Sequence, residues 1–103
     1  MRIGVIIRPR EGMEGLEALR EGVGSLRARG HEVRPRLTFE GGDGARLARQ
    51  AAESGAELII AAGGDGTLNE VVNGAVAVGW RGRFGLVPTG TANDFAAGMG
   101  IPL

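Results

Sequence analysis

The sequence contains no cysteine and no lysine, and it contains histidine only once. Without cysteine, neither a disulfide framework nor a thiolate zinc site can form. The single histidine, His31, excludes a multi-histidine metal cage. Without lysine, a Walker A phosphate loop is excluded because that loop requires Gly-Lys-Ser/Thr. The G-x-G-x-x-G dinucleotide fingerprint and the G-x-S-x-G nucleophile elbow are missing as well.

Long apolar runs and an excess of one charge are also lacking. The longest apolar run, Leu58–Ala62, has the length of a strand and is far shorter than the ~20 residues of a membrane helix. The net charge is +0, which argues against a nucleic-acid partner and against a polybasic membrane anchor. At 103 residues we expect one domain, located in the cytoplasm, with a core that needs no cross-links.

Glycine, in contrast, is abundant, with 20 residues, and the tetrapeptide GGDG occurs twice, at 41–44 and at 63–66. Both copies follow an apolar segment and precede an amphipathic one. Each copy is therefore either a plain turn or a ligand-binding loop. Their flanking residues differ, so they do not form an internal repeat.

Hydrophobic periodicity predicts alternating strands and helices along the whole chain. Expected strands are Arg2–Ile7, His31–Phe39, Glu57–Ala62 and Gly85–Val87, and expected helices are Glu14–Arg29, Asp43 to about Gly55, Thr67–Val78 and Asn93–Met99. This order predicts an α/β fold with a parallel sheet and helices on both faces. Pro35 favours an edge position for the second strand. Ligands of such sheets bind beyond the carboxyl ends of the strands, in the turns that follow them.

The second GGDG copy is the stronger candidate for a phosphate site. Consecutive glycines allow several backbone N–H groups to converge, and the following helix adds its own free N–H groups and the positive end of its dipole. Thr67 adds a hydroxyl donor, while Asp65 suits such a site if Mg²⁺ lies between it and the phosphates, or if it accepts a proton. The alternative is a tight turn in which Asp65 only caps the helix.

The turn after the fourth strand, in "VPTGTANDFA", carries Thr91, Asn93 and Asp94 at the same rim. Asp94 would supply a second carboxylate for Mg²⁺. Helix capping by Thr91 or Asn93 is the alternative.

With these motifs in view, "GGDGTLNEVVNG" followed by "GLVPTGTANDFAAGMGIP" resembles the diacylglycerol kinase catalytic domain family, over essentially the whole chain. The resemblance is strongest to its bacterial lipid kinases. It implies a three-layer Rossmann-like α/β domain of the phosphofructokinase and NAD kinase type. It also implies an ATP- and Mg²⁺-dependent kinase that phosphorylates a lipid hydroxyl.

The resemblance assigns site residues by motif. Asp65 would be the catalytic carboxylate, and Asp65 and Asp94 would lie around the metal. The nucleotide would be bound by Thr38, Gly63, Gly64, Asp65, Gly66, Thr67, Leu68, Asn69 and Thr91. The first GGDG copy matches only a Gly-Asp helix start, with Asp43 as the expected cap. For Glu70, two roles stay open: positioning Asp65 or Thr67, or forming part of a polar helix face.

Two departures from the family pattern qualify these assignments. Arg8 and Arg10, in "RPREG", stand where the family has an N-P-x-S-G-like turn. Family members also continue into a β-rich domain that carries much of the lipid site, and we expect residues 1–103 to be the ATP-binding domain without it. Such a chain would bind nucleotide weakly and show little lipid kinase turnover alone. It would contact a membrane surface at most transiently, and it could form a homodimer through a face left uncovered.

Two rival functions remain open from the sequence. An NAD kinase-like enzyme shares GGDGT but differs downstream of it. A non-catalytic nucleotide-binding module is the other. The loop containing Trp80, Arg81 and Arg83 is expected to be a solvated connection on the opposite rim.

Overall fold

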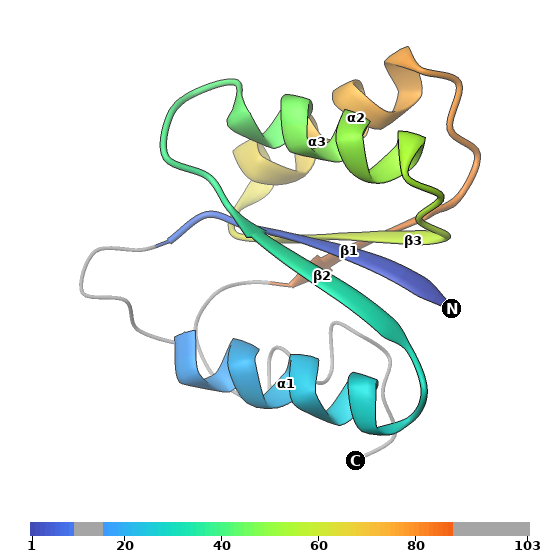
Figure 1. Cartoon of the computed structure of the whole chain (residues 1–103). Helices are drawn as coiled ribbons and strands as arrows, with labels where there is room; N and C mark the ends of the chain where they lie inside the picture. The colour runs from blue at the N-terminus through green and yellow to red at the C-terminus, as the bar shows by residue number, and fades with distance from the viewer. Residues whose placement is uncertain (10–15, 88–103) are drawn as a thin grey trace.

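The computed structural model describes residues 1–9 and 16–87 of the chain (Figure 1). Strands and helices alternate along these ranges, as the periodicity predicts. The elements are β1 (Arg2–Ile7), α1 (Leu16–Ala28), β2 (Glu32–Leu37), α2 (Asp43–Glu53), β3 (Leu58–Ala62), α3 (Asp65–Ala77) and β4 (Arg83–Val87). The predicted final helix, Asn93–Met99, lies outside the described residues. None of the described helices is long and apolar enough to cross a membrane.

The four strands form one parallel sheet in the order β2-β1-β3-β4. The central strands β1 and β3 are buried on both faces, which explains their nearly continuous apolar sequences. Val5 pairs with Ile60 on one side and with Pro35 on the other. The predicted edge position of the strand that contains Pro35 is therefore confirmed, and a proline is tolerated there because an edge strand leaves half of its N–H groups unpaired.

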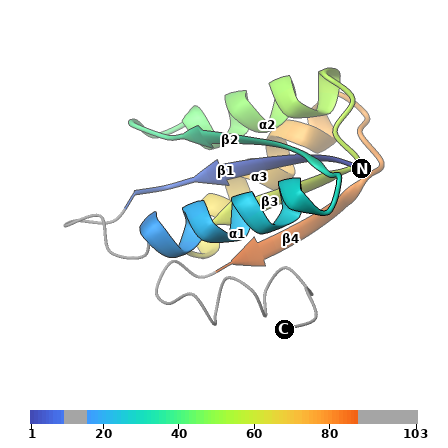
Figure 2. The same ribbon diagram turned by 60° about the horizontal axis from the view of Figure 1, so that its bottom comes forward.

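Helices cover both faces of the sheet and give three layers (Figures 1 and 2). On one face, α1 packs its apolar stripe over the sheet. That core contains Ile3, Val5, Ile7, Leu19, Val23, Leu26, Val33, Ile60, Ala62 and Val87. On the other face lie α2 and α3, around Ile6, Leu47, Ala48, Ile59, Ala61, Val71 and Ala75. The alternation of side chains along β1 divides its residues between these two cores.

Helices α2 and α3 pack against each other at very short range. A Cβ atom added at Gly74 of α3 would collide with the carbonyl oxygen of Ala45 on α2. A Cβ at Gly44 would lie 3.0 Å from the Cβ of Glu70. These two glycines therefore set the distance between the helices, and that distance in turn brings the two GGDG segments close to each other.

Three local expectations are corrected by the structure. Helix α3 begins at Asp65 rather than at Thr67, so half of the second GGDG copy belongs to its first turn. Asp43 is the first residue of α2 but does not cap it: the N-cap is Gly42 in a left-handed conformation, without a side-chain cap bond. Trp80 is half-buried rather than solvated, because its ring packs edge-on against Phe84 and its Nε1–H donates to the carbonyl of Ala56, 2.7 Å away.

Candidate functional site

The strand order places a topological switch point between β1 and β3. After β1 the chain moves outward to β2, and after β2 it returns across β1 to β3. In such sheets the crevice beyond the carboxyl ends at the switch point is the usual ligand site. Here the turns after β1 and β3 are held side by side, because the N–H of Arg8 donates to Ala62 O at 2.9 Å. The N–H of Gly63 donates in the same way to Val87 O, 3.0 Å away.

A pocket of about 350 Å³ opens at this rim. It is bordered by the turn after β1, the β2–α2 connection and the first turns of α2 and α3. Its lining residues are Arg8, Pro9, Thr38, Phe39, Glu40, Gly41, Gly44, Thr67 and Glu70. The volume lies within the range of small-molecule sites. Two residues predicted to touch nucleotide, Thr38 and Thr67, are thus brought together although 29 positions separate them in the sequence.

Thr67 is the most informative residue of the pocket. Its side chain is only 2% exposed, and its Oγ1 atom has no hydrogen-bond partner among the described residues. A buried hydroxyl without a partner costs free energy, so such a group calls for an explanation. A Cβ added at Gly63 would lie 2.6 Å from this oxygen, so only glycine at that position leaves room for the hydroxyl. A hydrogen-bond acceptor supplied by a ligand would satisfy this hydroxyl.

The N–H groups in the first turn of α3 are also open among the described residues. The N-cap of α3, Gly64, is extended and makes no side-chain cap bond. Within the described part of the chain, no acceptor meets the N–H groups of Asp65, Gly66 or Thr67. Gly64, Asp65 and Gly66 are exposed. Free N–H groups at the positive end of a helix dipole are the features that bind phosphate.

Around the first GGDG copy, two carboxylates accept backbone hydrogen bonds. Asp43 Oδ2 accepts hydrogen bonds from the N–H groups of Phe39 and Glu40, at 2.8 and 3.0 Å. Glu70 Oε1 accepts from the N–H of Gly42 at 2.8 Å. The N–H of Phe39, followed by that of Glu40 and by the guanidinium of Arg46, lowers the pKa of Asp43 below its ordinary value. Carboxylates therefore hold the N–H groups of Phe39, Glu40 and Gly42, which a phosphate would otherwise meet at this connection.

Glu70 is a residue whose role the sequence left undecided. Its carboxylate contacts neither Asp65 nor Thr67; it bonds to the β2–α2 connection instead. The sequence indicated this contact only weakly, because Glu70 and Gly42 are 28 positions apart. Only the packing of α2 on α3 brings the two residues together.

The remaining predicted site residues are placed as follows. Asn69 is exposed on α3. Leu68 packs against the core of α2 and α3, and its N–H bonds to Gly64 O at 3.2 Å, so the structure assigns it no contact with the pocket. Thr91, Asp94 and Arg10 lie outside the described residues. Among residues 1–9 and 16–87, no three acidic or histidine side chains cluster as a metal site would require.

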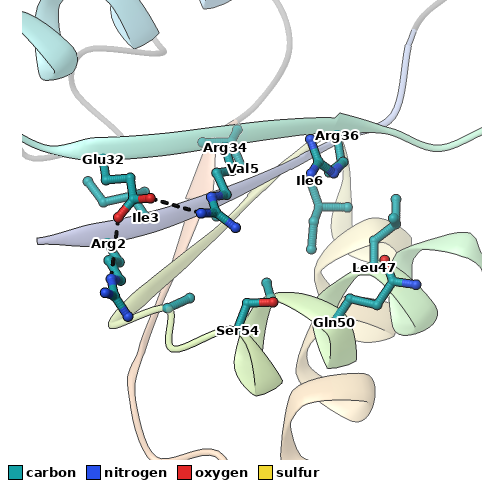
Figure 3. A pocket seen from close by; sticks show the side chains of 13 residues that line it. Arg2, Ile3, Val5, Ile6, Glu32, Arg34, Arg36, Leu47, Gln50 and Ser54 are labelled. Atoms are coloured by element: carbon teal, nitrogen blue, oxygen red, sulfur yellow. Dashed lines mark hydrogen bonds and ion pairs between the residues drawn. The ribbon is translucent and has the colours of Figure 1, made fainter.

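A second hollow, of about 110 Å³, lies away from this rim, between β2 and α2 (Figure 3). Three of its charged groups bond to one another: Glu32 accepts from Arg2 at 3.3 Å and from Arg34 at 2.9 Å. Arginines along an exposed edge strand also hinder pairing with another chain. The rim pocket, with its unpartnered buried hydroxyl, is therefore the candidate functional site.

The fold and the rim pocket together define a class: a parallel α/β domain whose switch point presents a helix start with N–H groups that have no acceptor among the described residues. The chain belongs to the family described as the diacylglycerol kinase catalytic domain, which it matches over residues 2–103. This match favours the lipid kinase interpretation over an NAD kinase-like one. The predicted α/β fold class is confirmed by similarity to solved structures of such kinases.

The relatives are longer than this chain. A probable lipid kinase YegS-like of Chromohalobacter salexigens is 51% identical over 89 residues, which cover 84% of this chain and 29% of that protein. Its counterpart in Cronobacter sakazakii is 49% identical over 88 residues, with the same coverage. The crystal structure of a diacylglycerol kinase from Bacillus anthracis superposes with a TM-score of 0.69 at 31% identity, covering 98% of this chain and 37% of that one. The chain thus spans about a third of the length of the relatives it matches.

Proposed function

We propose that this chain provides the ATP-binding part of a lipid kinase that transfers a phosphoryl group from ATP to a lipid hydroxyl. The observation that carries the proposal is the buried Thr67 hydroxyl, which has no partner in residues 1–9 and 16–87, beside the N–H groups at the start of α3 that also lack an acceptor there. Membership in the diacylglycerol kinase catalytic domain family supports the reaction class. The lipid site would lie in segments that the longer relatives have beyond the matched region.

The described residues fit a polyphosphate. The N–H groups of Asp65, Gly66 and Thr67 would donate to phosphate oxygens, and the Thr67 hydroxyl would gain its missing acceptor. Absence of side chains at Gly63 and Gly64 allows close approach to the backbone. Thr38, which is 8% exposed at the end of β2, would contact the nucleotide from the opposite wall of the pocket.

Mg²⁺ belongs to the same proposal. The described residues alone do not form a cation site, since Asp65 is the single carboxylate of the second GGDG loop. Asp65 is exposed at the rim, where it would approach a cation that arrives with the triphosphate, and Asp94 would be its partner. When bound, the ion neutralises charge on the phosphates. Asp65 would orient the ion and its phosphates.

The test is a titration of the chain with ATP and, separately, with inorganic tripolyphosphate, each with and without Mg²⁺. Thr67→Val should weaken both ligands by roughly tenfold or more, because a hydrogen bond to a charged group is lost. Asp65→Asn should weaken binding only when Mg²⁺ is present. Asn73→Ala, an exposed change on α3, is the matched control and should alter nothing. If the unmodified chain binds neither ligand, the proposal fails.

A further inference from the structure

The β2–α2 connection carries the most exposed large apolar side chain among the described residues. Phe39 is 85% exposed, whereas Met1, Leu37, Val76 and Val78 range from 38 to 57%. A single exposed apolar side chain is ordinary on a protein surface. What distinguishes Phe39 is its place, because it lines the same rim pocket as Thr67 and Thr38.

The backbone of Phe39 is held in place while its ring is left free. Its N–H donates to Asp43 Oδ2 at 2.8 Å, and the next N–H, of Glu40, donates to the same oxygen. Glu70 anchors the connection again at Gly42. The connection, which arcs from the end of β2 to the start of α2 in Figure 1, is therefore fixed at three N–H groups. An aromatic ring on a rigid backbone is ready to bind at little entropic cost.

The surroundings of the ring indicate what it would bind. Apart from Phe39 and Pro9, the pocket is lined by charged residues, threonines and glycines. An alkyl chain would find almost no apolar partner there. An anionic membrane surface would meet the carboxylate of Glu40, the residue after Phe39, whereas the base of a nucleotide carries no charge. A flat heterocycle with polar edges fits this pocket, because one of its faces can stack on the ring while the polar residues of the lining bond to its edges.

We propose that Phe39 is the stacking platform for the base of the nucleotide whose phosphates bind at the second GGDG loop. The buried, unpartnered hydroxyl of Thr67 marks the phosphate end of the pocket, and the exposed ring marks the base end. Thr38, the residue before Phe39, lines the same pocket and would contact the ribose. This inference rests on the proposed function and assigns an orientation to the ligand.

The test separates the base from the phosphates. ATP and inorganic tripolyphosphate are titrated into the wild-type chain, Phe39→Ala and Phe39→Trp, with Val76→Ala as the control, because Val76 is exposed on α3 outside the pocket lining. Phe39→Ala should weaken ATP about 5- to 100-fold and leave tripolyphosphate unchanged, because only the stacked base is lost. Phe39→Trp should retain ATP affinity, and its added fluorescence should change with ATP but not with tripolyphosphate. Val76→Ala should change neither affinity.

Each remaining outcome is decisive. If Phe39→Ala weakens neither ligand, or weakens both equally, the platform is disproved while the phosphate site stands. If it reduces binding to vesicles of anionic phospholipid and spares ATP, the ring serves a membrane surface and the inference is wrong. If wild type binds neither ligand, the proposed function fails first. Because the ring is exposed, the melting temperature of Phe39→Ala should equal that of wild type, which excludes a folding defect.

Discussion

Gly42 and Glu70 connect the two GGDG segments: the N–H of Gly42 donates to Glu70 Oε1 across 2.8 Å. Gly42 belongs to the first copy, and Glu70 lies on the helix that the second copy begins. The second segment thus supplies a helix start whose N–H groups have no acceptor among the described residues, while the Gly42 N–H of the first segment is held by a carboxylate. The same tetrapeptide sequence therefore adopts two different local structures around one pocket.

The contact between Gly42 and Glu70 should contribute measurably to stability. Glu70→Ala should lower the free energy of unfolding by roughly 1–2 kcal/mol, because a charge-assisted hydrogen bond is lost. Glu70→Gln keeps an acceptor oxygen, so its free energy of unfolding should fall by less than that of Glu70→Ala. Urea unfolding followed by circular dichroism measures both, and hydrogen exchange should show the Gly42 amide protected in wild type and exposed in Glu70→Ala. Glu53→Ala, an exposed change on α2, is the control. If Glu70→Gln and Glu70→Ala lowered the free energy of unfolding equally, the stabilisation would come from the charge of Glu70 and not from its acceptor oxygen.

Close packing of α2 on α3 predicts opposite results for two glycine substitutions. Gly74→Ala should destabilise the chain by about 1–3 kcal/mol, because the new methyl group forces the helices apart at Ala45. Gly24→Ala, on α1 with open space around it, should instead stabilise by up to ~1 kcal/mol through helix propensity. Thermal melts of the two variants compare them directly. A neutral Gly74→Ala would contradict the packing described for these helices.

Thr67 should show stability and binding changing in opposite directions. Thr67→Val keeps the shape and removes a buried oxygen that has no partner in the described residues. The free energy of unfolding should stay the same or rise by up to ~1 kcal/mol, since an unsatisfied polar group disappears. Thr67→Ser, which keeps the hydroxyl, is the control for binding. A marked loss of stability in Thr67→Val would mean that the hydroxyl is bonded in the folded chain.

The lowered pKa of Asp43 predicts that the β2–α2 connection stabilises the fold less in acid. Its pKa in the folded chain is lowered from 3.8, so the carboxylate stabilises the fold above that value and the contribution is lost as the pH falls through the lower folded pKa. Unfolding free energies of wild type and Asp43→Asn should therefore differ near neutral pH and converge in the acid region below 3.8. A difference between the two curves that did not change with pH would disprove this linkage.

Most of the fold was predictable because its signals are local. Buried parallel strands have continuous apolar sequences, as Leu58–Ala62 does, and amphipathic helices repeat apolar residues every three or four positions. Strand and helix order then determines a parallel sheet and its ligand-binding rim. Even the edge position of the strand with Pro35 followed from the missing N–H group of proline.

Helix boundaries were less predictable. The glycines of the second GGDG copy indicated a loop, yet α3 begins at Asp65, since packing of Val71 and Ala75 on the sheet offsets the low helix propensity of Gly66. Trp80 was expected in a solvated loop, but its Nε1–H donates to Ala56, 24 positions earlier in the chain, and its ring packs against Phe84 of β4.

By itself, the sequence determined the α/β class, the family, and which GGDG copy follows a fully buried strand and carries a threonine. These properties depend on residue type and short-range spacing. Only the tertiary structure decided that the Gly42 N–H is taken by Glu70, that the Thr67 hydroxyl has no partner among the described residues, and that Phe39 borders the same pocket. Those properties depend on contacts between residues far apart in the chain, which form only when α2 packs beside α3 on one face of the sheet.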